Sequence, residues 1–165
     1  MTDLPSDFFL QDALTVAPRL LGCRLVVDGK ELTISETEAY MGETDTACHA
    51  HHGRTRRTEM LYRRGGYVYV YLCYGIHSLL NIITGAGDDP QGVLIRCCAE
   101  ANGPGKLTKA LGIDLSFNGL DILTTDKIDL WRGPEGAFET APRVGIGYAS
   151  REDQQRLWRF IRKGE

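Results

Sequence analysis

The chain has 165 residues, of which 42% are hydrophobic and 25% charged, as expected for one globular domain with its own core. No run approaches the roughly 20 apolar residues of a membrane helix, and the opening MTDLPSDFF lacks the basic and apolar regions of a signal peptide. The five cysteines form no C-x-x-C pair, which argues against a disulfide framework and a zinc knuckle. We therefore expect one soluble, intracellular domain over residues 1–165.

The net charge of −3 and the isoelectric point near 5.8 argue mildly against a nucleic-acid partner, because duplex binding relies on Lys and Arg neutralising phosphates. The charges are unevenly distributed, however. Acidic residues gather between positions 31 and 45, and basic residues form dense runs at 54–64 and 151–163. Each run fits either a solvated charged face or a surface that meets phosphates, and charge alone leaves both open.

The first third of the chain predicts helix followed by hairpin. Apolar residues recur at helical spacing over residues 7–21, interrupted by Pro18 and closed by Gly22, which indicates one or two short helices. From Cys23 the period changes to two. Residues 23–27 and 31–40 are predicted to pair across a turn at residues 28–30.

Further strands are predicted after a loop that contains Gly and Arg. Residues 66–74 are rich in aromatic and β-branched residues and are broken by Gly75, and strands over 77–84 and 92–99 follow. A helix is predicted over 105–111, ended by Gly112, and a late strand over 143–147 beside the C-terminal residues. Strands bracketed by helices without regular βαβ alternation indicate an α+β fold.

Two carboxylates and a phenol are the first candidates for chemistry. Glu36, Glu38 and Tyr40 share one face of the predicted strand, because side chains alternate along a strand. The set could support acid/base catalysis, or it could be the wet face of an amphipathic strand.

Histidines and tyrosines supply a second group of candidates. Residues 48–52, CHAHH, hold four potential metal ligands, but ligands of one tetrahedral site are normally more widely spaced, so we predict no metal. We expect His49 to contact a planar ligand instead. Tyr67, Tyr69 and Tyr71 share a strand face, and Tyr74 precedes Gly75. Such a ladder can be simple packing. Arginines lie nearby, however, and tyrosines that stack on bases beside arginines that contact phosphates are typical of nucleic-acid binding.

The chain resembles the alkyladenine (3-methyladenine) DNA glycosylase family. The similarity is carried by blocks in the family's order over most of the chain: residues 36–40 (ETEAY), His49, 53–55 (GRT), 69–75 (YVYLCYG), 81–82 (NI), 93–96 (VLIR), 103–107 (GPGKL), 110–113 (ALGI) and 143–147 (RVGIG). The resemblance implies a compact domain with a curved, mainly antiparallel sheet, short flanking helices and a protruding, DNA-inserting β-hairpin.

The resemblance also implies roles. Glu38 would activate a water that Arg96 and the Val144 carbonyl help to hold. The flipped base would be enclosed by Tyr40, His49 and Tyr71, with Asn81 disfavouring guanine. Tyr74 would fill the gap left in the duplex. Backbone contacts are expected from the following basic residues: Arg54, Arg56, Arg57, Lys106 and Arg143.

The activity implied is hydrolysis of the N-glycosidic bond of alkylated or deaminated purines in double-stranded DNA, without cofactor or metal. No lysine is expected in the base pocket, so the enzyme should be monofunctional and leave an abasic site for a downstream endonuclease. It is expected to act as a monomer. It should be cytoplasmic and nucleoid-associated in a bacterium, or nuclear in a eukaryote.

Two other function classes remain. A carbohydrate glycosidase could use Glu36 and Glu38 as its carboxylate pair, but leaves Arg96, Asn81 and Tyr74 unexplained. A non-catalytic nucleic-acid-binding module would keep the tyrosines and arginines, but gives a carboxylate that faces an anionic ligand no purpose.

Overall fold

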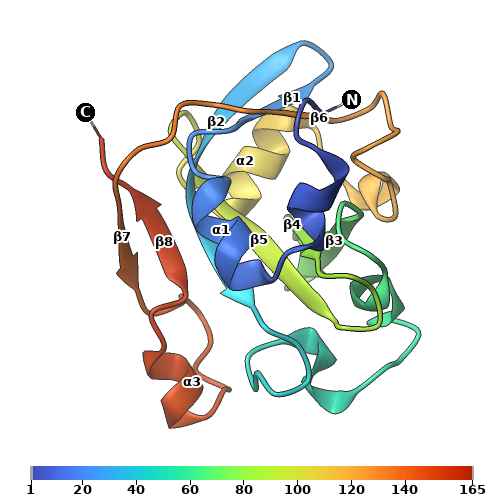
Figure 1. Cartoon of the computed structure of the whole chain (residues 1–165), viewed down its shortest axis with the longest axis vertical. Coiled ribbons are helices and arrows are strands. Elements are labelled where there is room, and N and C mark those ends of the chain that lie inside the picture. The colour runs from blue at the N-terminus through green and yellow to red at the C-terminus, as the bar shows by residue number, and fades with distance from the viewer. Residues whose placement is uncertain (1, 165) are drawn as a thin grey trace.

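The computed structural model describes residues 2–164 and is built around one curved antiparallel sheet (Figure 1). The strand order is β3-β4-β5-β2-β1-β6, with β7 and β8 attached through β2. The strands are β1 (Arg24–Val27), β2 (Lys30–Tyr40), β3 (Val68–Cys73), β4 (His77–Thr84), β5 (Gln91–Cys98), β6 (Asp129–Trp131), β7 (Phe138–Ala141) and β8 (Arg159–Arg162). The predicted α+β class is therefore confirmed.

Strand β2 is the longest and changes partners along its length. Its first residues pair with β1, and its second half lies between β5 and β8. The register with β5 shifts on both sides of Glu36, and such irregularities bend a strand. The bend allows one strand to serve both halves of the sheet. It also leaves the segment from Glu36 to Glu38 flanked by strands on both sides.

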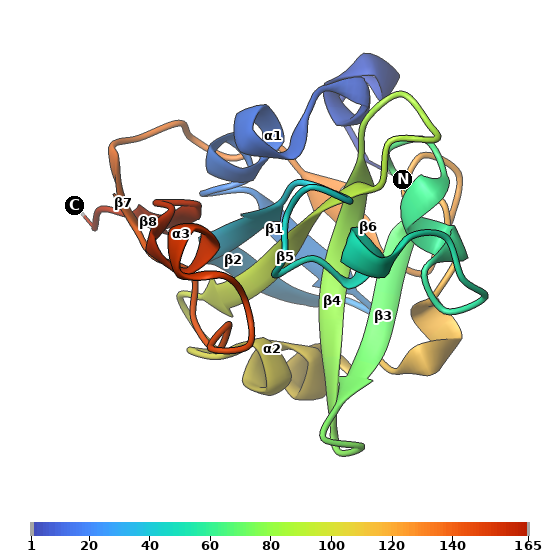
Figure 2. The ribbon, with the colours of Figure 1, turned by 90° about the horizontal axis from the view of Figure 1, so that it is seen from below.

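Three α-helices and four 3-10 helices complete the described chain. The α-helices are α1 (Ala13–Arg19), α2 (Pro104–Leu111) and α3 (Arg151–Gln155), and the 3-10 helices span Ser6–Leu10, His49–His52, Glu59–Tyr62 and Leu115–Phe117. Helices α1 and α2 lie on either side of β2 and β5 (Figure 2). No helix in residues 2–164 is long and apolar enough to cross a membrane.

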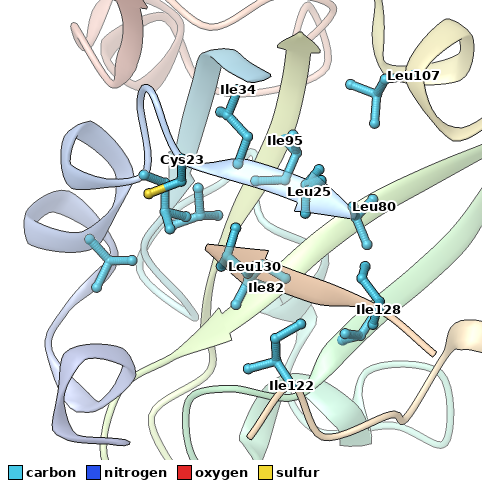
Figure 3. Packing of buried hydrophobic residues seen from close by; sticks show 14 of the residues in the cluster. Cys23, Leu25, Ile34, Leu80, Ile82, Ile95, Leu107, Ile122, Ile128 and Leu130 are labelled. Atoms are coloured by element: carbon cyan, nitrogen blue, oxygen red, sulfur yellow. The ribbon is translucent and has the colours of Figure 1, made fainter. Parts of the chain in front are cut away.

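The main core lies between the sheet and these helices. Its side chains come from segments far apart in sequence and include Leu25, Ile34, Leu80, Ile95 and Ile128, all of which are fully buried (Figure 3). Burying such side chains provides the main drive for folding. A smaller aromatic cluster, built from residues such as Tyr62 and Tyr69, packs apart from this core.

Most of the predicted elements are present, and one is wrong. The N-terminal helices, the β1–β2 hairpin, β3 to β5 and α2 lie where the sequence placed them. Residues 143–147 are a loop, not a strand. The late strands are β7 and β8, which pair with each other at the sheet's edge. The glycines at 145 and 147 leave segment 143–147 little strand propensity, and Gly145 has a φ of +72°.

Candidate active site

Glu38 is a fully buried carboxylate on β2 and forms the centre of the candidate site. Its Oε1 accepts a hydrogen bond from the Tyr40 hydroxyl at 2.8 Å, so Glu38 and Tyr40 share a strand face as predicted. Its Oε2 accepts from the Val144 backbone N–H at 2.7 Å and lies 3.7 Å from the Arg96 Nε. Three separate segments therefore converge on one carboxylate.

Opposing effects act on the pKa of Glu38. Burial raises it above the ordinary value of 4.5, because an apolar surrounding disfavours the charged form. The Val144 N–H, the Arg96 charge and the Tyr40 hydroxyl act in the opposite direction and support the carboxylate. A carboxylate with a raised pKa is a stronger base than an exposed one, which suits proton abstraction.

An aromatic pocket adjoins Glu38. The His49 ring packs edge-on against Tyr71 at 4.5 Å between centroids, and its Nδ1 is 3.0 Å from the Tyr69 hydroxyl. Burial, helped by the Arg57 charge, lowers the pKa of His49 below 6.5. The imidazole is therefore neutral at pH 7, and the pocket presents uncharged rings.

The residues proposed for catalysis, together with three of the base-pocket residues and Tyr74, face one cleft of about 730 Å³. The cleft is lined, among others, by Glu38, Tyr40, His49, Tyr71, Tyr74, Arg96, Lys106 and Val144. Asn81 lies in a smaller adjoining pocket that shares Tyr40, His49 and Tyr71 with the cleft. Its Nδ2 donates to the Tyr69 carbonyl at 3.3 Å, which orients the amide. Glu38 and Val144, which are 106 positions apart in the chain, are thus brought together.

Tyr74 stands at the tip of the β3–β4 hairpin, which protrudes from the body of the molecule (Figure 2). The side chain is 90% exposed, and Ile76 beside it is 75% exposed. Tyr74 and Gly75 have φ values of +53° and +67° in the tight turn that the Ile76 N–H closes on the Cys73 carbonyl. A tyrosine rarely adopts such a φ, so the turn holds the ring outward at some cost in strain.

The sequence of the whole chain then identifies its relatives. The model of the methylpurine-DNA glycosylase family matches residues 7–101 and 99–165. The chain belongs to the methylpurine-DNA glycosylase family. It is 47% identical to a Borreliella afzelii protein, with 95% of this chain and 94% of the relative covered.

More distant bacterial relatives agree with this membership. The chain is 42% identical to a protein of Nitrosococcus oceani, covering 97% of this chain and 90% of the relative. It is 38% identical to one of Rickettsia rickettsii, covering 96% and 88%. The names of these proteins contain the words "3-methyladenine DNA glycosylase". The predicted family is therefore confirmed.

The prediction that Arg143 contacts the DNA backbone is wrong. Arg143 is a fully buried side chain whose guanidinium forms a forked ion pair with buried Asp45, at 2.6 and 2.9 Å. A guanidinium with no exposed surface cannot contact a phosphate. Asp45 and Arg143 lie 98 positions apart, so no local sequence pattern indicates the pair.

The other basic candidates remain on the surface. Arg56 and Arg57 are exposed, and Lys106 lies at the first turn of α2 along the cleft. Arg54 is engaged with Asp88 at 2.7 Å and with Glu59 at 3.4 Å, so part of its charge is already balanced. Lys109 also lines the cleft, whereas neither Lys106 nor Lys109 is among the residues that line the smaller pocket with Asn81.

The carbohydrate-glycosidase alternative loses support from the geometry. Glu36 pairs with Arg159 at 3.4 Å and is not among the residues that line the cleft, so the two glutamates do not form a shared carboxylate pair. Within residues 2–164, no three His, Cys, Asp or Glu side chains gather as a metal site. Cys48 is buried, and the His51 Nδ1 bonds the Glu43 carbonyl at 2.8 Å.

The sequence did not indicate what the Val144 backbone contributes. The resemblance assigned its carbonyl to holding water, whereas the contact present in the structure is the Val144 N–H donating to Glu38. A backbone donor leaves no trace in residue identity. Only the juxtaposition of the 143–147 loop with β2 shows it.

Proposed function

We propose that this protein removes alkylated or deaminated purines from duplex DNA by hydrolysing the N-glycosidic bond, leaving an abasic site. The observation that carries this is the buried Glu38 carboxylate at the side of an aromatic cleft, next to an exposed tyrosine on a protruding hairpin. The family membership supports the same conclusion.

Glu38 acts as the general base. Each of its oxygens accepts one hydrogen bond from the protein, and a carboxylate oxygen can accept two, so a lone pair remains on each for a water. The water oxygen attacks C1′ of the sugar and its proton passes to Glu38. The purine leaves with the electron pair of the glycosidic bond. Arg96 and the Val144 carbonyl help to hold this water.

Tyr40, His49 and Tyr71 enclose the extruded base. Stacking contributes about 1–3 kcal/mol per base, comparable with the few kcal/mol needed for extrusion. A purine methylated at N3 or N7 is cationic and is attracted by electron-rich rings. Because His49 is neutral at pH 7, it does not repel that charge.

Selectivity and DNA binding follow from the surrounding residues. Asn81 lies where a guanine 2-amino group would project and so disfavours normal guanine. Tyr74 enters the duplex in place of the flipped nucleotide. Arg56, Arg57 and Lys106 contact the DNA backbone, with a smaller part for Arg54. The protein acts as a monomer, and an abasic-site endonuclease processes its product.

Excision is tested on a duplex that contains one hypoxanthine, with ethenoadenine and methylated DNA as further substrates. Alkali after incubation should cut the strand only at the lesion, and Glu38→Gln should give no cut while still binding the duplex. The absence of cleavage with all three substrates would refute the proposed activity. Borohydride should trap no covalent adduct, although Lys106 and Lys109 line the cleft.

A further inference from the structure

Two loops meet beside Glu38, and each carries part of the site. The first, the pocket loop (residues 41–48), leads from Tyr40 to His49. The second, the clamp loop (residues 142–150), carries the Val144 N–H and Tyr148. Neither loop contains a helix or strand, so regular backbone pairing does not hold it in place.

The Asp45 carboxylate joins the two loops. Its Oδ2 accepts from the Arg143 Nη1 at 2.6 Å and from the Met41 N–H at 3.0 Å. Its Oδ1 accepts from the Arg143 Nη2 at 2.9 Å and from the Ala47 N–H at 3.1 Å. One buried carboxylate thus stabilises the turn of its own loop and binds the arginine of the other loop.

Arg143 passes this constraint to the active site. Its Nη1 also donates to the Ala39 carbonyl at 3.0 Å, and its guanidinium lies about 4.8 Å from the Tyr40 ring and 4.9 Å from the Trp158 ring. The next residue is Val144, whose N–H bonds Glu38. With the guanidinium fixed on three sides, the peptide that follows it has little freedom.

A buried ion pair is weak evidence for stability, because the cost of removing two charges from water offsets their attraction. Fixing a geometry is the better-supported use of such a pair. We propose that Asp45 is a positioning residue for excision: through Arg143 it sets the Val144 N–H against Glu38, and through its own loop it sets His49 in the base pocket. This inference rests on the proposed role of Glu38 as general base.

A change in the protonation of Glu38 is the expected consequence. Without a placed Val144 N–H the carboxylate loses support, and its pKa rises further. The other charged or titratable groups that influence Glu38 are Arg96 on β5, Tyr40 on β2, Tyr71 on β3, and Arg143 and Tyr148 of the clamp loop. Because the pKa values of Arg143 and of the three tyrosines are raised, Arg143 stays charged and the phenols stay neutral between pH 4 and 8. The pKa of His49 in the pocket is lowered from 6.5, so its charge can change in this range. The carboxyl of Glu38 must therefore be followed directly.

The test is Asp45→Asn, read by carboxyl ¹³C titration of Glu38 in the free protein and by single-turnover excision. We expect the midpoint to rise by about one pH unit and excision at neutral pH to slow at least tenfold. Asp121→Asn is the matched control. Asp121 forms a 2.6 Å pair with Arg64 and accepts from the Leu123 N–H at 3.1 Å, away from the cleft.

A folded Asp45→Asn protein with the wild-type midpoint and rate would overturn the proposal, as would equal effects in the Asp121→Asn control. Should Asp45→Asn fail to fold, Arg143→Lys keeps the charge but cannot form the fork, and the same two changes are expected. Unfolding of both variants would mean that the pair is purely structural. The titration needs no DNA, so it reports on positioning even if the wild type excises nothing.

Discussion

The exposed Tyr74 allows binding and stability to be separated by one substitution. We consider Tyr74→Asn, because asparagine tolerates the positive φ of +53° better than tyrosine does. The ring is 90% exposed, so its loss removes almost no buried surface. The free energy of unfolding should be unchanged or raised by up to about 1 kcal/mol.

Binding to damaged DNA, unlike stability, should be weakened by the same substitution. Removal of one stacked ring should weaken it by about 1–3 kcal/mol, which raises Kd about 5- to 150-fold. The loss should be smaller when the lesion is mispaired, because less unstacking must then be offset. Fluorescence anisotropy on an ethenoadenine duplex at fixed salt, with Glu38→Gln in both proteins to prevent turnover, measures the change.

Phe138→Ser is the matched control. Phe138 is 42% exposed on β7 and does not line the cleft, so its substitution should leave Kd unchanged. The reasoning is refuted if Tyr74→Asn lowers the unfolding free energy by more than about 1 kcal/mol while the folded protein binds normally. In that case Tyr74 would be a packing residue.

Three further outcomes are expected. Burial raises the pKa of Glu38 in the folded state, so the contribution of this carboxyl to stability is complete below about pH 4.5 and is lost as pH rises through the raised pKa. The Tm of Glu38→Gln relative to that of wild type should therefore increase from pH 4 to 7. A constant difference in Tm would contradict this. EDTA should leave excision unchanged, whereas loss restored by zinc would indicate a metal. Lys106→Gln should weaken binding to damaged and undamaged duplex alike, and should lower the salt dependence of the binding constant by about one released counterion. An effect confined to damaged duplex would argue against a phosphate contact.

The secondary-structure elements with a strong local residue pattern could be predicted from the sequence. The alternation from Cys23 to Tyr40 predicted the first hairpin and placed Glu38 beside Tyr40, and the aromatic run before Gly75 predicted the protruding hairpin. The positive φ values at the hairpin turns lie at or beside glycines, as turn chemistry requires. The ordered motif blocks indicate the same family that the family model matches.

Features that depend on residues far apart in the chain could not be predicted from the sequence. Strand β6 has three residues and exists because it pairs with β1, a contact that no local pattern announces. Arg143 looked like a surface cation until Asp45, 98 positions away, was found to neutralise it in the interior. The Val144 N–H that supports Glu38 is a backbone group present at nearly every residue. Burial, charge pairing and backbone donation are properties of position in space, and a sequence read along one dimension does not specify them.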